Sequence, residues 1–128
     1  LEMVAGQQWQ DLGRQLSRVG QMDRRQLHRL RIRIKKMRYW LDLCLPQTAQ
    51  DQIRELALGQ DLLGDWLDCL VMGDLLVSLD VDADGAASFV RWLEERQSQL
   101  DGRIGLWADT SALLEMAPAS AWPGKEKA

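Results

Sequence analysis

The sequence predicts an all-α protein, folded as an antiparallel four-helix bundle. Apolar residues recur every three or four positions through four successive segments, which is the spacing of one helix face. No segment shows the sustained alternation of apolar and polar residues that marks a half-buried strand. Short connections between four amphipathic helices favour antiparallel neighbours. With 128 residues, 46% of them hydrophobic, the chain is long enough to bury one core.

The first two helices have clear apolar faces and boundaries. The first is expected to end near Gly20, and its apolar face consists of Trp9, Leu12, Leu16 and Val19. Asp23 is a candidate N-cap for the second helix, and Pro46 follows its expected end. The apolar ridge of the second helix consists of Leu27, Leu30, Ile34, Met37, Leu41 and Leu45.

The third helix is expected from about Ile53 to about Leu79. Gly102 and Gly105 are expected to bend or break the fourth, because glycine destabilises a helix interior. From Pro118 the chain is rich in alanine, proline and lysine, so we expect a helical domain over residues 1–117 and a flexible tail over 118–128. The fourth helix carries its apolar face on Phe89, Leu93, Leu100, Ile104 and Trp107.

Charge is distributed very unevenly along the chain. The net charge of −3 would by itself argue against a polyanionic partner. Between Arg24 and Arg38, however, there are eight Lys and Arg residues and no acid, whereas Glu55 to Val90 holds eight acids and no base. The charge of each segment is therefore more informative than the total.

The cysteines and the hydropathy pattern indicate a cytoplasmic protein. Cys44 and Cys69 lie in apolar stretches and are expected to be buried free thiols in a reducing compartment. No apolar run approaches the roughly 18 residues of a membrane span, and residues 1–20 show no signal peptide. The chain begins with Leu1 rather than methionine, which is compatible with a piece of a longer protein.

The basic residues of the second helix form two groups. Successive helical residues are about 100° apart around the axis, so five basic residues fall on a stripe about 80° wide beside the apolar ridge. Tyr39 and Ile32 lie at the other edge of this stripe, while Arg25, Arg29, Arg33 and Lys36 fall on the face expected to meet bulk water. The basic stripe consists of Arg24, His28, Arg31, Lys35 and Arg38.

Two explanations of this stripe remain open from helical spacing alone. Like charges three or four residues apart repel one another, so the stripe is expected to meet opposite charge. A bound polyanion or a partner's carboxylates would supply it. The alternative is internal neutralisation by Asp61, Asp65 and Asp68, which share one face of the third helix.

Neither catalysis nor metal binding is predicted. The only histidine, His28, belongs to the basic stripe, so no second histidine is present to activate a serine. The segment DVDADG, Asp80 to Gly85, matches the first half of a calcium loop. Arg91 stands at the position where that loop needs a bidentate glutamate, so we expect no metal and no cofactor.

Two motifs resemble the CHAD family, the conserved histidine α-helical domains. The segment LHRLRIRIKKMRYWLDL is similar to the family signature, and QDLLGDWLD resembles its second motif. Together they span about Leu27 to Leu76. Asp42 replaces a more usual glutamate, and Trp66 and Leu67 replace a small aliphatic residue and an asparagine. The matching positions are His28, Arg31, Lys35, Arg38, Tyr39 and Asp42 in the first motif and Gln60, Asp61, Leu63, Gly64 and Asp68 in the second.

The resemblance implies binding of inorganic polyphosphate without catalysis, and so favours a polyanionic ligand over internal neutralisation. The phosphate-binding residues would be those of the basic stripe, Arg24, His28, Arg31, Lys35 and Arg38, with Tyr39, Asp42 and Asp68 in supporting positions. CHAD domains contain two helical halves around a basic pore, and this chain resembles the second half alone. The expected partner is therefore the other half of the same domain or a second copy of the chain.

Two other binding functions remain as alternatives, and an enzyme is a third, which would require a catalytic domain elsewhere in the parent chain. A nucleic-acid-binding module would use the same stripe to neutralise phosphates, although the stripe has few aromatic neighbours and the third helix is acidic. A helical interaction domain would dock the stripe against an acidic protein.

Overall fold

The structure, a computed structural model, describes residues 2–79 and 83–110, and it describes side chains within 7–79 and 84–109. Its elements are α1 (Glu2–Leu16), the short 3-10 helix η1 (Val19–Gln21), α2 (Arg24–Cys44), α3 (Gln50–Ser78) and α4 (Ala83–Thr110). Every element within the described ranges is helical, which confirms the all-α bundle. The expected tail, 118–128, lies outside these ranges.

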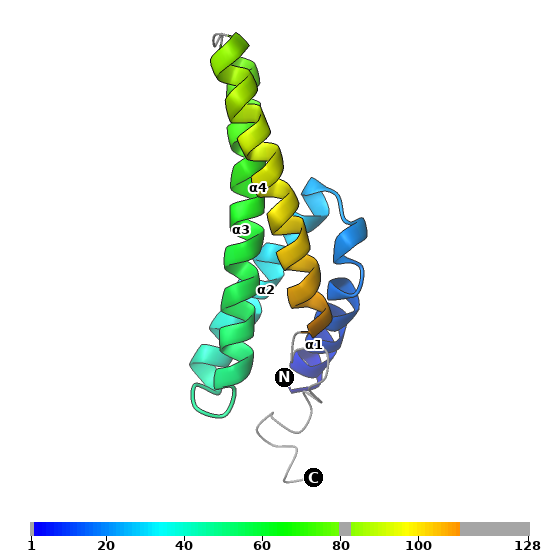
Figure 1. The fold of residues 1–128 in the computed structure, drawn as a ribbon. Coiled ribbons are helices and arrows are strands. Elements are labelled where there is room, and N and C mark those ends of the chain that lie inside the picture. Colours follow the sequence, from blue (N-terminus) through cyan, green and yellow to red (C-terminus); the bar gives the residue numbers. More distant parts are fainter. Residues whose placement is uncertain (1, 80–82, 111–128) are drawn as a thin grey trace.

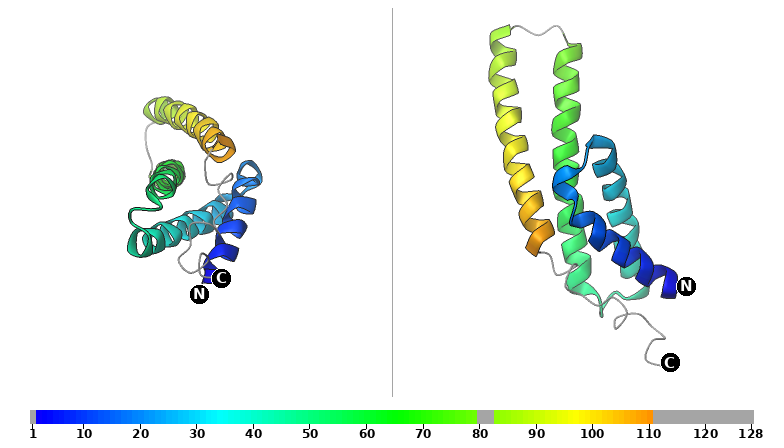
Figure 2. Two further views of the ribbon diagram at one scale, coloured as in Figure 1. Left: turned by 90° about the horizontal axis from the view of Figure 1, so that it is seen from below. Right: turned by 90° about the vertical axis from the view of Figure 1, so that its right-hand side faces the viewer.

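Helices α3 and α4 form a long antiparallel hairpin; α2 packs against α3, and α1 packs against α2 (Figure 1). The principal helix–helix contacts join α2 to α3 and α3 to α4. Helix α1 contacts α2, and η1 contacts α4. Figure 2 shows that the free end of the hairpin projects beyond α1 and α2.

The beginning and end of α2 follow the sequence closely. The Asp23 side chain accepts a hydrogen bond from the Gln26 backbone N–H at 2.8 Å, and the Gln26 side chain accepts one from the Asp23 N–H at 2.9 Å. This reciprocal capping box satisfies two backbone donors at the helix start. The helix ends at Cys44, two residues before Pro46, as predicted.

The core is continuous through the described helices and includes the predicted apolar faces of α1 and α2. Leu12, Leu16, Ile34, Leu56 and Leu63 are essentially inaccessible to solvent. The ridge of α2 is buried along its whole length, which fixes the rotation of this helix and hence the direction of its basic residues.

Two predictions about individual residues were wrong. Helix α4 continues through Gly102 and Gly105 without a break, because Leu100, Ile104 and Trp107 pack into the core on either side of them. The packing of those side chains offsets the cost of placing glycine rather than alanine in a helix interior, which is about 1 kcal/mol per residue. Cys44 is exposed, whereas Cys69 is buried as expected, and both thiols are free.

None of the described helices combines the length and the apolar character that crossing a bilayer requires.

Candidate functional site

The basic stripe runs along α2 at its border with α3. Arg24, His28 and Lys35 are exposed, while Arg31 and Arg38 are partly buried. Because the apolar ridge of α2 faces the core, the stripe lies at the edge of the core, as predicted from helical spacing.

Arg31 contacts the backbone of α3. Its Nε donates a hydrogen bond to the Gln60 carbonyl oxygen at 3.3 Å. A Cβ atom added at Gly64 would lie 3.1 Å from the same Nε and 3.3 Å from Nη2, so the absence of a side chain makes room for the guanidinium. Gln60 and Gly64 both belong to the second motif, and their contact with Arg31 gives that motif a structural role.

A hollow of about 670 Å³ lies beside the N-terminal end of the stripe. Leu67 and Val71 of α3 form its apolar side. Its polar side carries three basic residues and one carboxylate from the start of α2, so its net charge is positive when histidine is protonated or neutral. The α2 residues that line it are Asp23, Arg24, Arg25 and His28.

Tyr39 contacts the other end of the stripe. The Lys35 ammonium lies 5.7 Å from the centre of the Tyr39 ring, and the Arg38 guanidinium carbon lies 5.2 Å from it. Both distances allow a cation–π attraction, which holds the two basic groups near one exposed ring. The supporting role expected for Tyr39 in ligand binding stays a prediction.

The internal neutralisation considered from the sequence does not occur in the described part of the chain. Within it, the guanidinium of Arg24 is the only group of the stripe that forms an ion pair, with Asp74 at 2.7 Å, and Asp74 was not among the carboxylates considered. Asp65 instead lies 3.7 Å from Arg96 of α4. Four members of the stripe, His28, Arg31, Lys35 and Arg38, therefore retain uncompensated donors.

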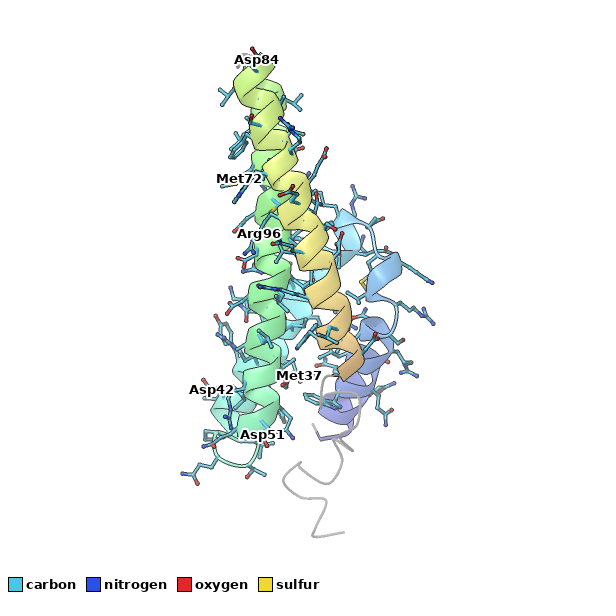
Figure 3. All side chains as sticks on the ribbon, viewed as in Figure 1. Met37, Asp42, Asp51, Met72, Asp84 and Arg96 are labelled. Atoms are coloured by element: carbon cyan, nitrogen blue, oxygen red, sulfur yellow. The ribbon has the colours of Figure 1, made fainter. Side chains whose placement is uncertain are left out.

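The supporting roles expected of Asp42 and Asp68 stay predictions. Both carboxylates are exposed, and neither forms a hydrogen bond or an ion pair with another described residue. Asp42 lies in the last turns of α2, near the lower end of the bundle in the view of Figure 3. Asp68 lies one turn beyond Gly64 on α3, and therefore near the site of the Arg31 contact.

A second group of arginines was missed in the sequence. Arg29 and Arg33 are exposed, as expected, but they also line a hollow of about 530 Å³ together with Arg14 and Arg18. The pattern of α2 alone could not reveal this hollow, because its other wall comes from the end of α1 and from η1.

Cys69 is the described group whose pKa shifts clearly. Burial raises the pKa of its thiol, and Asp65 and Asp68 act in the same direction against the opposing effect of Arg96. A thiol with a raised pKa is a poor nucleophile at neutral pH. Within 7–79 and 84–109, no group of three or more histidine, cysteine or acidic side chains is arranged to hold a metal ion.

No curated protein and no solved structure matches the chain. The family comparison matches residues 1–77 to the CHAD domain, which is more than half of the sequence. This range contains the whole basic stripe, the Arg31 contact with α3 and both motifs. The chain therefore belongs to the CHAD domain family.

Proposed function

We propose that this protein binds inorganic polyphosphate through the basic stripe of α2 and carries out no chemistry of its own. Membership of the CHAD family supports this function, since CHAD domains are polyphosphate-binding helical domains. The observation that best supports the proposal is that most basic side chains of the stripe form no ion pair in the part of the chain that the structure describes. His28, Lys35 and Arg38 form no ion pair with a described carboxylate, although acidic α3 is the neighbouring helix.

The spacing of these donors suits a linear chain of phosphates. Residues three or four apart on one helix face follow one another along the axis, rising about 1.5 Å per residue. A polyphosphate lying along α2 would therefore meet successive donors. Arg31 and Arg38 offer planar guanidinium groups that can hold two phosphate oxygens at once, and Lys35 offers a mobile point charge.

The N-terminal end of the stripe offers a different contact. His28 lines the hollow between α2 and α3, and a protonated imidazole donates hydrogen bonds from both nitrogens. Arg24 lines the same hollow, where its ion pair with Asp74 is exposed and contributes little to stability. Polyphosphate can therefore replace Asp74 as the partner of Arg24 at small cost.

Polyphosphate is favoured over nucleic acid by the position of the aromatic residues. Trp9 and Trp107 are buried and Trp92 is in the first half of α4, which leaves Tyr39, already in contact with Lys35 and Arg38, as the one exposed ring beside the stripe within the described residues. Single-stranded nucleic acids gain much of their affinity from such stacking.

Binding titrations with three ligands of matched charge test the proposal. Long-chain polyphosphate, single-stranded RNA and an acidic peptide should be titrated into the intact chain at one ionic strength. We expect polyphosphate to bind most tightly. Equal affinity for the three ligands would indicate an unselective positive surface, and tighter binding of the RNA or the peptide would support the corresponding alternative function.

A further inference from the structure

A second basic surface lies where α1 and η1 meet α2. We call it the arginine groove, a hollow of about 530 Å³ whose volume falls within the roughly 300–1,000 Å³ of typical ligand sites. Arg14 comes from the end of α1, Arg18 from the turn just before η1, and Arg29 and Arg33 from α2. The groove is thus a product of tertiary packing between two basic segments.

The charge of the arginine groove is largely uncompensated. Asp11 is the only carboxylate among the described residues that line it, and Asp11 already forms an ion pair with Arg14. The guanidinium groups of Arg18, Arg29 and Arg33 form no ion pair or hydrogen bond with another described residue. Bringing these like charges together costs free energy, which a bound anion would recover.

The neutral lining of the groove is also rich in hydrogen-bonding groups. Gln15, Gln21 and Gln26 contribute amide side chains, and Met22 is the one apolar side chain among the described lining residues. The buried side-chain oxygen of Gln15 has no hydrogen-bond partner within the described part of the chain.

We propose that the arginine groove is a second anion-binding site, which takes a compact anion carrying several phosphate groups. Four guanidinium groups on two walls suit an anion with oxygens on more than one side, because each planar guanidinium can hold two oxygens. The described lining includes no aromatic ring on which a base could stack, so the ligand class is an oligophosphate rather than a nucleic acid. This inference does not rest on the binding of polyphosphate to the stripe.

Inorganic tripolyphosphate is a suitable probe, titrated into the intact chain by calorimetry. The groove variant would be Arg18→Gln with Arg33→Gln, which removes one charge from each wall. The stripe variant would be Lys35→Gln with Arg38→Gln. The matched control, Lys36→Gln with Arg103→Gln, removes two exposed charges that line neither hollow. Each variant changes the net charge by the same amount, and thermal melts would verify folding.

We expect the groove variant to lose at least about tenfold in tripolyphosphate affinity, equivalent to about 1.4 kcal/mol, since hydrogen bonds to charged groups are lost. The stripe variant should retain binding at the groove, and the control should change little. Equal losses in the groove and control variants would overturn the inference.

Amide chemical shifts of the unmodified chain supply an independent readout. Tripolyphosphate should shift the backbone signals of residues 14–21 and of Arg29 and Arg33. If only signals along the stripe respond, the arginine groove is not a site, whereas the proposal for the stripe would stand. If the signals of the groove respond and those of the stripe do not, the arginine groove is a site and the proposal for the stripe is contradicted.

Discussion

Arg31 and Gly64 show how the second motif shapes the basic stripe. The hydrogen bond from Arg31 to the Gln60 carbonyl brings a guanidinium against the backbone of α3, and Gly64 provides the space. A guanidinium has five N–H donors, so one bond to a carbonyl leaves the remainder free for a ligand. The motif was recognisable in the sequence, but its contact with Arg31 depends on the packing of α2 on α3.

The two cysteines should differ strongly in their reaction with alkylating reagents. Cys44 is exposed, whereas burial shields Cys69 and raises the pKa of its thiol, so less thiolate is present at neutral pH. We expect iodoacetamide to modify Cys44 rapidly and Cys69 only slowly in the folded protein, with the rate at Cys69 increasing as the pH rises above neutral. Mass spectrometry of peptides after timed quenching would measure both rates. Equal rates at pH 7 would contradict the burial of Cys69.

At the scale of single residues, the features predicted correctly were those set by residues nearby in the sequence. The Asp23 cap and the buried positions of α2 follow from neighbours within one turn or one helix face. The exposure of Cys44 did not follow, because it depends on where neighbouring helices cease to cover the end of α2. The pairing of Asp65 with Arg96 likewise depends on α4 lying against α3.

At the scale of elements, close contact between α3 and α4 depends on Gly59. A Cβ atom at this position would overlap the ring of buried Trp107, whose Nε1 donates a hydrogen bond to the Glu55 carbonyl at 3.0 Å. A second link joins the helices where Trp66 Nε1 donates to Asp101 Oδ1 at 2.7 Å. These contacts place two long helices side by side, and α3 in turn supports the stripe of α2.

Alanine substitutions at two glycines of α3 should therefore have opposite effects. Gly59→Ala should lower the free energy of unfolding by about 1–3 kcal/mol, the usual cost of overpacking a core. Gly73→Ala meets no atom within 4 Å and should raise the free energy of unfolding by up to about 1 kcal/mol, because alanine favours the helix. Urea unfolding followed by circular dichroism would measure both. A stabilising Gly59→Ala would contradict the packing of Trp107.

The four main helices and the apolar faces of α1 and α2 were predictable because a helix face repeats with a fixed period, whereas Phe89 of the predicted α4 face is exposed. The elements that pack against each helix face could not be predicted from the sequence. The pattern of α2 correctly assigned Arg29 and Arg33 to an exposed face, but it could not show that α1 and η1 complete a groove beside them. The expected break of α4 at its glycines was wrong for a related reason, since packing by neighbouring helices outweighs local propensity.

At the scale of the whole molecule, the projecting end of the α3–α4 hairpin carries an exposed apolar surface. Phe89 stacks on Trp92 with ring centres 5.7 Å apart, and Trp92 is 52% exposed. Figure 3 labels Met72 on this part of α3 and Asp84 of α4 near the tip of the hairpin. Apolar surfaces of this kind mark sites of association. The exposed apolar residues here are Met72, Leu75, Val77, Leu79, Phe89, Val90 and Trp92.

We expect this surface to drive self-association, with a second copy of the chain in the place of the other CHAD half. Met72→Gln with Leu75→Gln should shift sedimentation velocity profiles towards monomer at a given concentration. The matched control, Leu43→Gln with Leu58→Gln, removes two exposed apolar residues away from the hairpin end and should leave the profiles unchanged. An unmodified chain that remains monomeric at all concentrations would contradict this prediction.

The salt dependence of long-chain polyphosphate binding tests the central claim most directly, when it is measured for the unmodified chain and two double variants. Arg31→Ala with Lys35→Ala removes charges of the stripe, and Lys36→Ala with Arg103→Ala removes exposed charges elsewhere. By analogy with nucleic acids, each lost phosphate contact lowers the log–log salt slope by about one, so the stripe variant should bind more weakly with a slope reduced by about two. The control should retain the slope of the unmodified chain. Affinity that does not vary with salt, or equal losses in both variants, would contradict binding at the stripe.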